Sequence, residues 1–302
     1  MGVPKRSTPR AWERSHAFAL GLAPALIVLT AITLGPAIYL VVTSLTPLNL
    51  ANPTTGFDFS HPFGNYEDAL TDSRFLNSVW VQAKLSGATV VLQLAAGLGV
   101  ALLLNAHSRV LEAIRTAFLI PMVLPPIVVA VIWKVIYTPD VSPLHRGLAA
   151  LGLPLGSLVT NPGTAIWAIV VADTWEWFPF TMLMTLAALQ MIPTAPLEAA
   201  AIDGANRWQL FRFIVLPYVK PTLVVCGLFR LIDSIKAFPL IYVLTNGGPG
   251  TATEVTNYYG FVEAFNFSYW GYGSAIATMM VAGVFLLSVL VGRLDPGLGS
   301  HG

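Results

Sequence analysis

The stretch Glu198–Pro217, EAAAIDGANRWQLFRFIVLP, is a polar island between two long apolar segments. The chain on either side of it is almost entirely Leu, Val, Ala and Phe. The island instead carries polar and charged side chains at Glu198, Asp203, Arg207, Gln209 and Arg212. Charged side chains are costly inside an apolar environment, so we expect this insert to lie outside it. There it is available to contact another molecule.

Two short helices are predicted in and just before this stretch. Thr194 is expected to cap the first helix and Pro196 to lie in its first turn, where a missing N–H costs little. Glu198 then lies early in the helix, where the helix dipole favours a negative charge. Asp203-Gly204 is a turn signal and is expected to end this helix.

The second helix is predicted to begin after Asn206. Gln209 lies three positions after Asn206, so the pair has the spacing of a capping box. Leu216-Pro217 is expected to close this helix. The prediction is therefore a helix–turn–helix hairpin that lies flat on a membrane surface.

The composition predicts an integral membrane protein. The 302 residues are 55% hydrophobic and only 10% charged, with a mean hydropathy of +0.70, whereas a soluble domain carries roughly a quarter charged residues. Cys226 is the single cysteine, which excludes an intramolecular disulfide and a cysteine-rich metal site.

Six stretches are long and apolar enough to cross a bilayer as helices, which takes about 20 residues each. Several contain prolines, so tilted or kinked helices are expected. We predict an all-α membrane protein with one transmembrane domain at 17–293, tails at 1–16 and 294–302, and the hairpin at 194–217 between the fourth and fifth spans. The expected spans are Ala17–Leu45, Asn77–Leu104, Leu111–Tyr137, Gly163–Leu189, Val219–Leu244 and Tyr272–Val291.

The distribution of Lys and Arg predicts the orientation, because cytoplasmic segments carry an excess of both. If the N-terminus is cytoplasmic, ten of these residues lie in inside segments and only Arg74 and Arg146 lie in outside loops. Both termini, the turn at 105–110 and the insert at 190–218 are therefore expected inside. The loops at 46–76, 138–162 and 245–271 are expected outside.

The insert resembles the EAA loop of permease subunits of bacterial ATP-binding-cassette importers. Glu198-Ala199-Ala200, Gly204 and Ile214-Val215-Leu216-Pro217 match that motif at every spacing. The resemblance implies a type I importer permease fold, in the bacterial inner membrane, with the loop as a coupling helix in a cleft of a separate ATPase. The residues that it assigns to ATPase docking are Glu198, Ala199, Ala200, Asp203, Gly204 and Arg207.

A second stretch, Leu228–Pro249, resembles the carbohydrate branch of these permeases, which imports sugars and polyols. Arg230, Asp233 and Lys236 lie near one face of the fifth span. One interpretation is a charge ladder that neutralises itself within the helix, and the other is a lining of the substrate path. Pro239 stands where the branch often has an Asp, and a helix kink is expected there.

The fourth span offers Asp173, Trp175, Glu176 and Trp177 as substrate contacts, because a sugar site needs flat aromatic faces and a few polar groups. The two tryptophans are alternatively part of an aromatic belt or of ordinary packing. The resemblance also implies that permeases work as pairs, so the sister subunit is an alternative place for the whole site.

The chain is not expected to be an enzyme. It has no phosphate-binding Gly-x-x-x-x-Gly-Lys-Ser/Thr sequence and no metal-ligand spacing among its five histidines. No metal or cofactor is therefore expected in this chain, with ATP and Mg on the partner ATPase.

The resemblance implies four partners: a homologous second permease, a pair of cytoplasmic ATPase subunits, an extracytoplasmic solute-binding protein and membrane lipid. No nucleic-acid partner is expected. Three alternatives stay open at this point: a permease for glycerol-phosphate or another small organic solute, an ion-coupled secondary transporter, and a membrane enzyme built on Asp173, Glu176 and Asp233.

Overall fold

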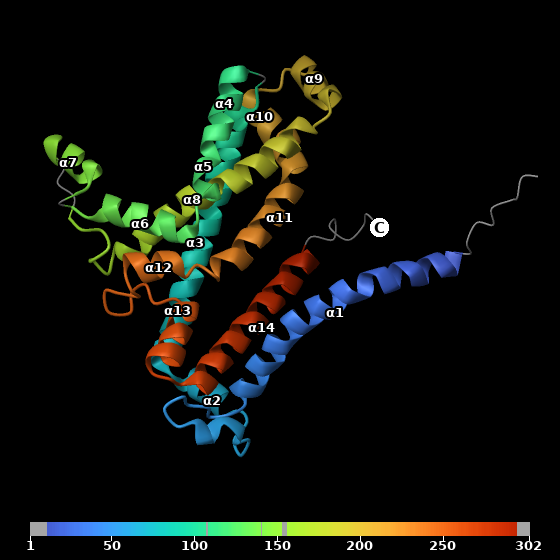
Figure 1. Cartoon of the computed structure of the whole chain (residues 1–302). Helices are drawn as coiled ribbons and strands as arrows, with labels where there is room; N and C mark the ends of the chain where they lie inside the picture. The colour runs from blue at the N-terminus through green and yellow to red at the C-terminus, as the bar shows by residue number, and fades with distance from the viewer. Residues whose placement is uncertain (1–10, 107, 140, 153–155, 295–302) are drawn as a thin grey trace, which may run out of the picture.

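The computed structural model describes residues 11–294 except 107, 140 and 153–155, and the expected tails lie largely outside that part. All regular elements in it are helices (Figure 1). They are α1 (Ala11–Ser44), the 3₁₀ helix η1 (Pro53–Phe57), α2 (Gly64–Thr71), α3 (Ser73–Leu104), α4 (Arg109–Phe118), α5 (Ile120–Val123), α6 (Pro126–Tyr137), α7 (Pro143–Ala150), α8 (Ala165–Gln190), α9 (Thr194–Ile202), α10 (Arg207–Leu210), the π-helical turn η2 (Phe211–Val215), α11 (Leu216–Ser234), α12 (Pro239–Leu244), α13 (Thr256–Phe261), the π-helical turn η3 (Val262–Asn266) and α14 (Trp270–Leu294).

Four helical segments in the described part are long and apolar enough to cross a membrane singly. Two further pairs of helices pass the same test only together, and each pair is sharply bent at a short break. The number of crossings is therefore four, or up to six if each bent pair is one crossing. Each expected span contains helix, although two of them are interrupted, and the number six stays a prediction.

The third expected span, Leu111–Tyr137, is broken at its centre. The helices on either side of Leu124 and Pro125 meet at 98°. Pro125 and Pro126 lack the N–H that would continue the helix, and a residue before a proline avoids helical backbone angles. As a result α6 crosses the bundle instead of extending α4 and α5 (Figure 1).

Helices α3 and α8 form the central pair of the bundle. Their backbones are in close contact at Gly97, where an added Cβ would lie 2.5 Å from the Cβ of Thr181 and 2.8 Å from the backbone nitrogen of Met182. Only glycine permits this approach. Because α11 packs against both helices, the three helices form the frame that holds the side chains described below.

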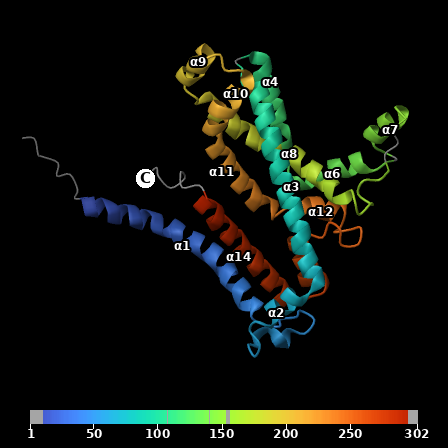
Figure 2. The same ribbon diagram turned by 180° about the vertical axis from the view of Figure 1, so that it is seen from behind.

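Helix α1 packs along α14 and diverges from the rest of the bundle, so the two groups of helices form an open V (Figures 1 and 2). Its apolar side chains remain exposed; Ile27 and Ile32 each keep 67% of their surface. None of the most apolar window of α1 is buried within this chain. The exposed face of α1 must therefore be covered by lipid or by another chain.

The helix at the fifth expected span, Val219–Leu244, differs from the prediction at both ends. It begins at Arg207, runs without interruption through Pro217 and ends at Ser234, so that 28 residues form one rod. The prediction that Leu216-Pro217 closes the hairpin's second helix is wrong. A π turn lies just before Pro217, and in it the Leu216 N–H donates to the Phe211 carbonyl. This change in hydrogen-bond register lets the helix continue through a proline, which has no N–H to donate.

The expected kink near Pro239 is a full break. Helix α11 ends at Ser234 and α12 starts at Pro239, so the predicted span Val219–Leu244 is not one helix. A proline is well suited to a first helical turn but not to the interior, which places the end of α11 before it.

A polar cluster joins α3 to α13 and α14 at the end of the molecule opposite α9 (Figure 1). Asp72 accepts hydrogen bonds from the hydroxyls of Tyr259 and, at 3.1 Å, Tyr272. Arg74 donates to both carboxylate oxygens of Glu254 at 2.8 and 2.7 Å. Burial raises the pKa of Asp72, but hydrogen bonds from Tyr259 and the Arg74 backbone outweigh this and lower it below the usual value. The cluster fixes the outer ends of these helices to one another.

Candidate functional site

The hairpin forms at the predicted place with one difference at its start. Thr194 is the first residue of α9 rather than its cap; Pro193 occupies the cap position, with no side-chain hydrogen bond. The helix ends at Asp203 as predicted, and Gly204 follows with φ +76°. No atom lies within 4 Å of the place where a Gly204 Cβ would stand, so the backbone angle alone requires glycine here.

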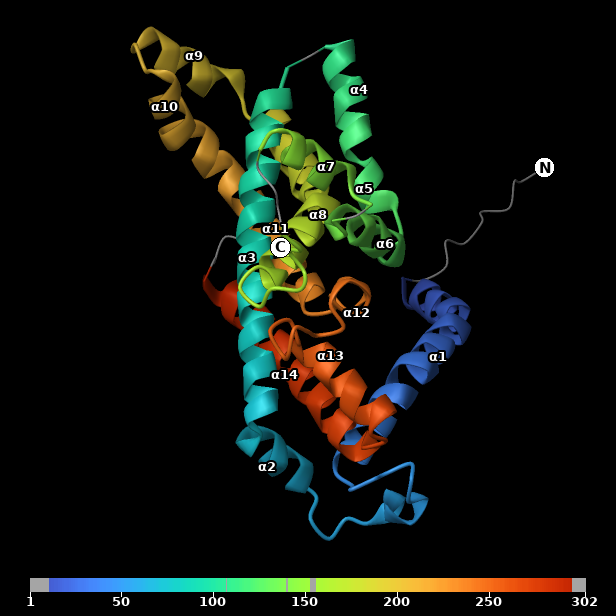
Figure 3. The same cartoon turned by 90° about the vertical axis from the view of Figure 1, so that its left-hand side faces the viewer.

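The capping box at the start of the hairpin's second helix is confirmed. The Asn206 N–H donates to Gln209 Oε1 at 2.8 Å, and the Gln209 N–H donates to Asn206 Oδ1 at 2.9 Å. Two otherwise unpaired amide groups are thereby satisfied. This helix continues into α11, so only α9 lies across the end of the bundle and the picture of a wholly flat hairpin is wrong (Figure 3).

The residues assigned to ATPase docking lie together on the surface of the hairpin. Glu198, Ala199, Asp203, Gly204 and Arg207 are exposed, and Ala200 is half-buried. Two large apolar side chains beside them, Ile202 and Trp208, are exposed as well. On the inner side the hairpin is fixed by Leu197 and Leu210, which pack into an apolar core shared by α3 and α8. The hairpin is thus anchored on its inner side and exposes both charged and apolar side chains on its outer side.

The charged residues of the fourth and fifth spans converge in the structure. Arg230, which is 3% exposed, donates through Nε to Gln93 Oε1 at 2.8 Å and through NH1 to Asp233 Oδ2 at 2.6 Å. Its NH2 lies 3.7 Å from Asp173 Oδ2. Gln93 completes the connection by donating to Asp173 Oδ2 at 2.7 Å. One buried guanidinium therefore joins α3, α8 and α11.

The two tryptophans of the fourth span have different surroundings. The guanidinium of Arg230 lies over the ring of Trp177, 4.4 Å from its centroid, which is a cation–π contact. Trp175 points elsewhere and packs edge to face on Trp133 at 5.8 Å in the main apolar core. Trp177 therefore belongs to the charged site and Trp175 does not.

A small cavity of about 110 Å³ opens beside this network; we call it the charged pocket. It is lined by Pro126, Asp173, Glu176, Trp177, Asp233, Lys236, Ala237, Pro239 and Leu240. Glu176 is almost fully buried, and its Oε1 has no hydrogen-bond partner in the described part of the chain. Lys236 is exposed and forms no ion pair with a described residue. Neither Glu176 Oε1 nor the Lys236 ammonium is therefore paired with a described residue.

The charge ladder predicted along α11 forms only in part. Asp233 neutralises Arg230 within the helix, as that interpretation requires, but Lys236 lies beyond the end of α11. Asp233 keeps 41% of its side chain exposed and lines the charged pocket as well. The ladder interpretation is therefore confirmed for Arg230 and Asp233 only, and a lining of the substrate path stays a prediction.

Sequence reasoning missed two glutamines of α3. Gln93 connects Asp173 to Arg230, and Gln82 donates to the Ser234 carbonyl at 3.2 Å, at the end of α11. The signal was present: both amides interrupt an apolar span and lie on the same side of the helix, since eleven residues are close to three turns. In the described residues, no group of His, Cys, Asp and Glu side chains has the arrangement of a metal site.

The fold agrees with that of solved transporters. The chain superposes on a subunit of a bacterial alginate ABC transporter, crystallised with its pentasaccharide-bound periplasmic protein, with a TM-score of 0.82 over 97% of this chain and 99% of that one. At 20% sequence identity this match shows the fold alone.

Two relatives with assigned substrates are considerably closer in sequence. A trehalose/maltose permease protein, MalF, of Thermococcus litoralis is 37% identical over 77% of this chain and 78% of its own length. The trehalose permease protein SugA of Mycobacterium tuberculosis is 33% identical over 97% of this chain and 94% of its own. Residues 93–300 also match the family described as binding-protein-dependent transport system inner membrane component. The chain belongs to this family of inner-membrane transport components.

Proposed function

We propose that the chain is one of two permease subunits of an ATP-driven importer that takes a sugar or polyol from an extracytoplasmic binding protein. The observation that carries the proposal is the hairpin. Its docking residues are exposed around an anchored core, while the rod that starts in it ends at the charged pocket. The relatives named for trehalose and maltose transport support the substrate class.

The charges of the pocket favour a neutral substrate. Asp173, Glu176 and Asp233 contribute three carboxyl groups against two cations, and the Arg230 cation is already engaged by Asp173 and Asp233. A phosphorylated or carboxylated solute would meet only Lys236 as a free positive charge. Sugar hydroxyls instead both donate and accept, which suits Glu176 and Asp233.

The exposed apolar surface of α1 supports a second permease subunit as partner. Side chains such as Ile27 and Ile32 are exposed in the described part of the chain, and α1 diverges from α3 and α11, with α14 between them (Figure 2). We expect the second permease to cover this face of α1, with one ATPase bound at each hairpin.

The test is a purification of the complex in mild detergent from the native membrane, with mass spectrometry of the proteins that accompany the chain. We expect a Walker-motif ATPase and a second permease. Glu198→Lys reverses the charge of an exposed docking residue and should lose the ATPase while keeping the second permease. Glu67→Lys makes the same change at an exposed site in α2 and serves as the control.

Purification of the chain with no ATPase, together with solute movement in vesicles that contain no ATP, would contradict the proposal and indicate a secondary transporter. Normal ATPase recovery in the Glu198→Lys variant would contradict the docking role of the hairpin while leaving the importer in place.

A further inference from the structure

A second cavity, of about 530 Å³, opens at the end of the molecule opposite α9, and we call it the outer pocket. It lies between the loop after α1, helix α2, the start of α3, α13 with η3, and the start of α14 (Figure 1). Eleven residues line it, and all but Pro47 and Leu48 carry a hydrogen-bonding side chain. Small-molecule sites have volumes of roughly 300–1,000 Å³. The outer pocket is therefore large enough for a small molecule, and its lining suits a polar one.

The walls of the outer pocket are tied to one another. Asn65 donates through Nδ2 to the Ser44 and Thr46 carbonyls at 2.9 and 2.8 Å. The Gly271 N–H donates to the Leu48 carbonyl at 2.8 Å. An added Cβ at Gly271 would lie 2.0 Å from the Thr46 carbonyl oxygen, so only glycine permits this contact. These contacts hold the ends of α1, α2 and α14 around the pocket, which is therefore formed before a ligand binds.

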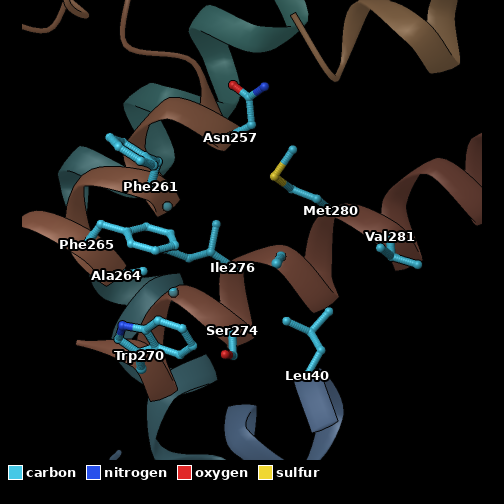
Figure 4. Close-up of a pocket in the computed structure, with 13 residues that line it drawn as sticks. Leu40, Asn257, Phe261, Ala264, Phe265, Trp270, Ser274, Ile276, Met280 and Val281 are labelled. Atoms are coloured by element: carbon cyan, nitrogen blue, oxygen red, sulfur yellow. The ribbon is translucent and has the colours of Figure 1, made fainter. Parts of the chain in front are cut away.

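The outer pocket differs from a neighbouring groove of about 470 Å³ between α1, α13 and α14. Figure 4 shows that groove, whose side chains are mostly apolar, as Phe265 and Leu40 are. It offers a polar ligand few hydrogen-bonding groups. Consecutive residues of the chain separate the two cavities, because Tyr269 lines the outer pocket and Trp270 lines the groove.

The charged groups of the outer pocket have partners, with one exception. Arg74 pairs with Glu254 at 2.7 Å and with Glu263 at 3.5 Å, and Asp72 accepts hydrogen bonds from two tyrosine hydroxyls. Asp68 is exposed, and its carboxylate forms no ion pair or hydrogen bond with a described residue. A cation would find only Asp68 free, whereas an anion would meet three carboxylates around one guanidinium that is already engaged. The outer pocket therefore favours a neutral ligand.

Tyr269 provides the open aromatic surface of the outer pocket. It keeps 49% of its surface exposed, and its ring packs on no other aromatic ring in the described part of the chain. Its hydroxyl forms no hydrogen bond with a described residue. The other two tyrosines of the lining, Tyr259 and Tyr272, are instead engaged with Asp72. A ligand in the pocket therefore has access to the ring and hydroxyl of Tyr269 and to the carboxylate of Asp68.

We propose that the outer pocket is a saccharide site, which holds a sugar from the binding protein before the sugar reaches the charged pocket. A pyranose has an apolar C–H face, which packs on an aromatic ring, and hydroxyls at its edge, which both donate and accept. Tyr269 supplies the ring. Asp68 supplies carboxylate oxygens that accept from hydroxyls, and Asn65, whose Nδ2 is engaged, supplies its amide oxygen.

The volumes of the two sites support this order. The outer pocket has about 530 Å³ and the charged pocket about 110 Å³, so the outer pocket accommodates a larger part of a saccharide at one time. It also lies where the loops are predicted to be extracytoplasmic, on the side from which a binding protein would deliver its sugar (Figure 1). This inference rests on the proposed import of a sugar.

The first experiment is equilibrium dialysis of labelled trehalose and maltose against the purified complex of both permeases and the ATPase, without the binding protein. Tyr269→Leu removes the ring, and Tyr269→Trp keeps a ring with a polar edge. Asp68→Ala removes the carboxylate. Two matched controls lie outside the pocket: Tyr218→Leu removes a tyrosine of α11 that is 48% exposed, and Glu67→Ala removes the exposed carboxylate next to Asp68.

We expect Tyr269→Leu to weaken sugar binding roughly two- to tenfold, the range that corresponds to one aromatic contact. Asp68→Ala should weaken it roughly tenfold or more, because hydrogen bonds to a charged group are the stronger ones. Tyr269→Trp and both controls should bind as the unmodified complex does. Unchanged binding in both Tyr269→Leu and Asp68→Ala would overturn the outer site and leave the importer in place.

The second experiment locates the sugar with a photoreactive trehalose derivative and mass spectrometry of the labelled peptides. We expect labelled peptides that contain Asp68 or Tyr269, and we expect excess trehalose to prevent the labelling. Label confined to α8 and α11, which contribute to the charged pocket, would overturn the outer site.

Two other results also decide the matter. If the Tyr269→Leu complex no longer binds the binding protein, the outer pocket is a contact for that protein, and the saccharide site is overturned. An unmodified complex that takes up none of trehalose, maltose and glycerol in proteoliposomes, with ATP and the binding protein present, would overturn the proposed function, and the outer site with it.

Discussion

At the residue scale, the guanidinium of Arg230 is the group on which the interior of the bundle depends. It bonds to Gln93 and Asp233, pairs with Asp173 and lies over Trp177. A charge in a membrane span is costly unless it is paired. The partners of Arg230 on α3, α8 and α11 therefore fix the positions of these helices relative to one another.

Replacing Arg230 by Met should therefore destabilise the protein by about 3–5 kcal/mol, because Asp173 would remain buried without its counter-charge. The measurement is the midpoint of thermal unfolding of the purified complex in detergent. Lys236→Met is the control: it removes an exposed cation that forms no ion pair with a described residue, and it should leave that midpoint unchanged. Equal midpoints in all three proteins would contradict the structural role of the pairing.

Gly97 gives a second prediction at this scale. An added methyl group would lie 2.5 Å from the Thr181 Cβ, so Gly97→Ala should separate α3 from α8 and lower the stability by about 1–3 kcal/mol. Gly99→Ala in the same helix meets no atom within 4 Å and should stabilise the helix slightly. Unfolding midpoints that are lowered equally by both substitutions would show that the close approach to Thr181 is not what decides the effect at Gly97.

The sequence indicated most of the charged site, since Asp173, Glu176, Arg230 and Asp233 are conspicuous in apolar spans. It offered both Trp175 and Trp177 as substrate contacts, with packing as the alternative; the structure places Trp177 beside Arg230 and Trp175 in the apolar core. Residues two apart on a helix do not share a face, and the i, i+4 relation of Asp173 to Trp177 is the feature of the sequence that separates the two tryptophans. Gln93 was missed because a neutral amide is not conspicuous in a long span, and only the fold brings it to Asp173.

At the scale of elements, apolar length predicted where helices occur but not where they end. The helix continues through Pro217 because a π turn precedes it, whereas the helices are interrupted at Pro125 and before Pro239. A proline's effect depends on whether its neighbours' carbonyls find other donors, and that is a property of the packed structure.

The turn of the hairpin carries a prediction of its own. Gly204→Val places a branched side chain at φ +76°, with a cost of about 1–2 kcal/mol in backbone strain. It should reduce the amount of ATPase that co-purifies with the chain. Gly204→Asn is the control, because asparagine adopts left-handed backbone angles more readily. Full ATPase recovery with the valine variant would mean that docking does not depend on this turn.

At the scale of the whole molecule, the separation of α1 from the central helices means that the apolar surface of α1 is not buried within the described chain. We predict that a photoreactive amino acid in place of Ile32, which is 67% exposed, will cross-link to the second permease in native membranes. The adduct should disappear when the second permease is deleted. Cross-linking to lipid alone, with the second permease present, would contradict the assignment of this face.

The uninterrupted rod from Arg207 to Ser234 has a mechanical consequence. At 1.5 Å per residue, its 28 residues are about 42 Å long. Arg207 of the hairpin stands at one end and Arg230 at the other. A continuous helix transmits a push along its length, so a displacement of the hairpin by a bound partner would act as a lever on the Arg230 network, through the π turn and past Pro221 inside α11.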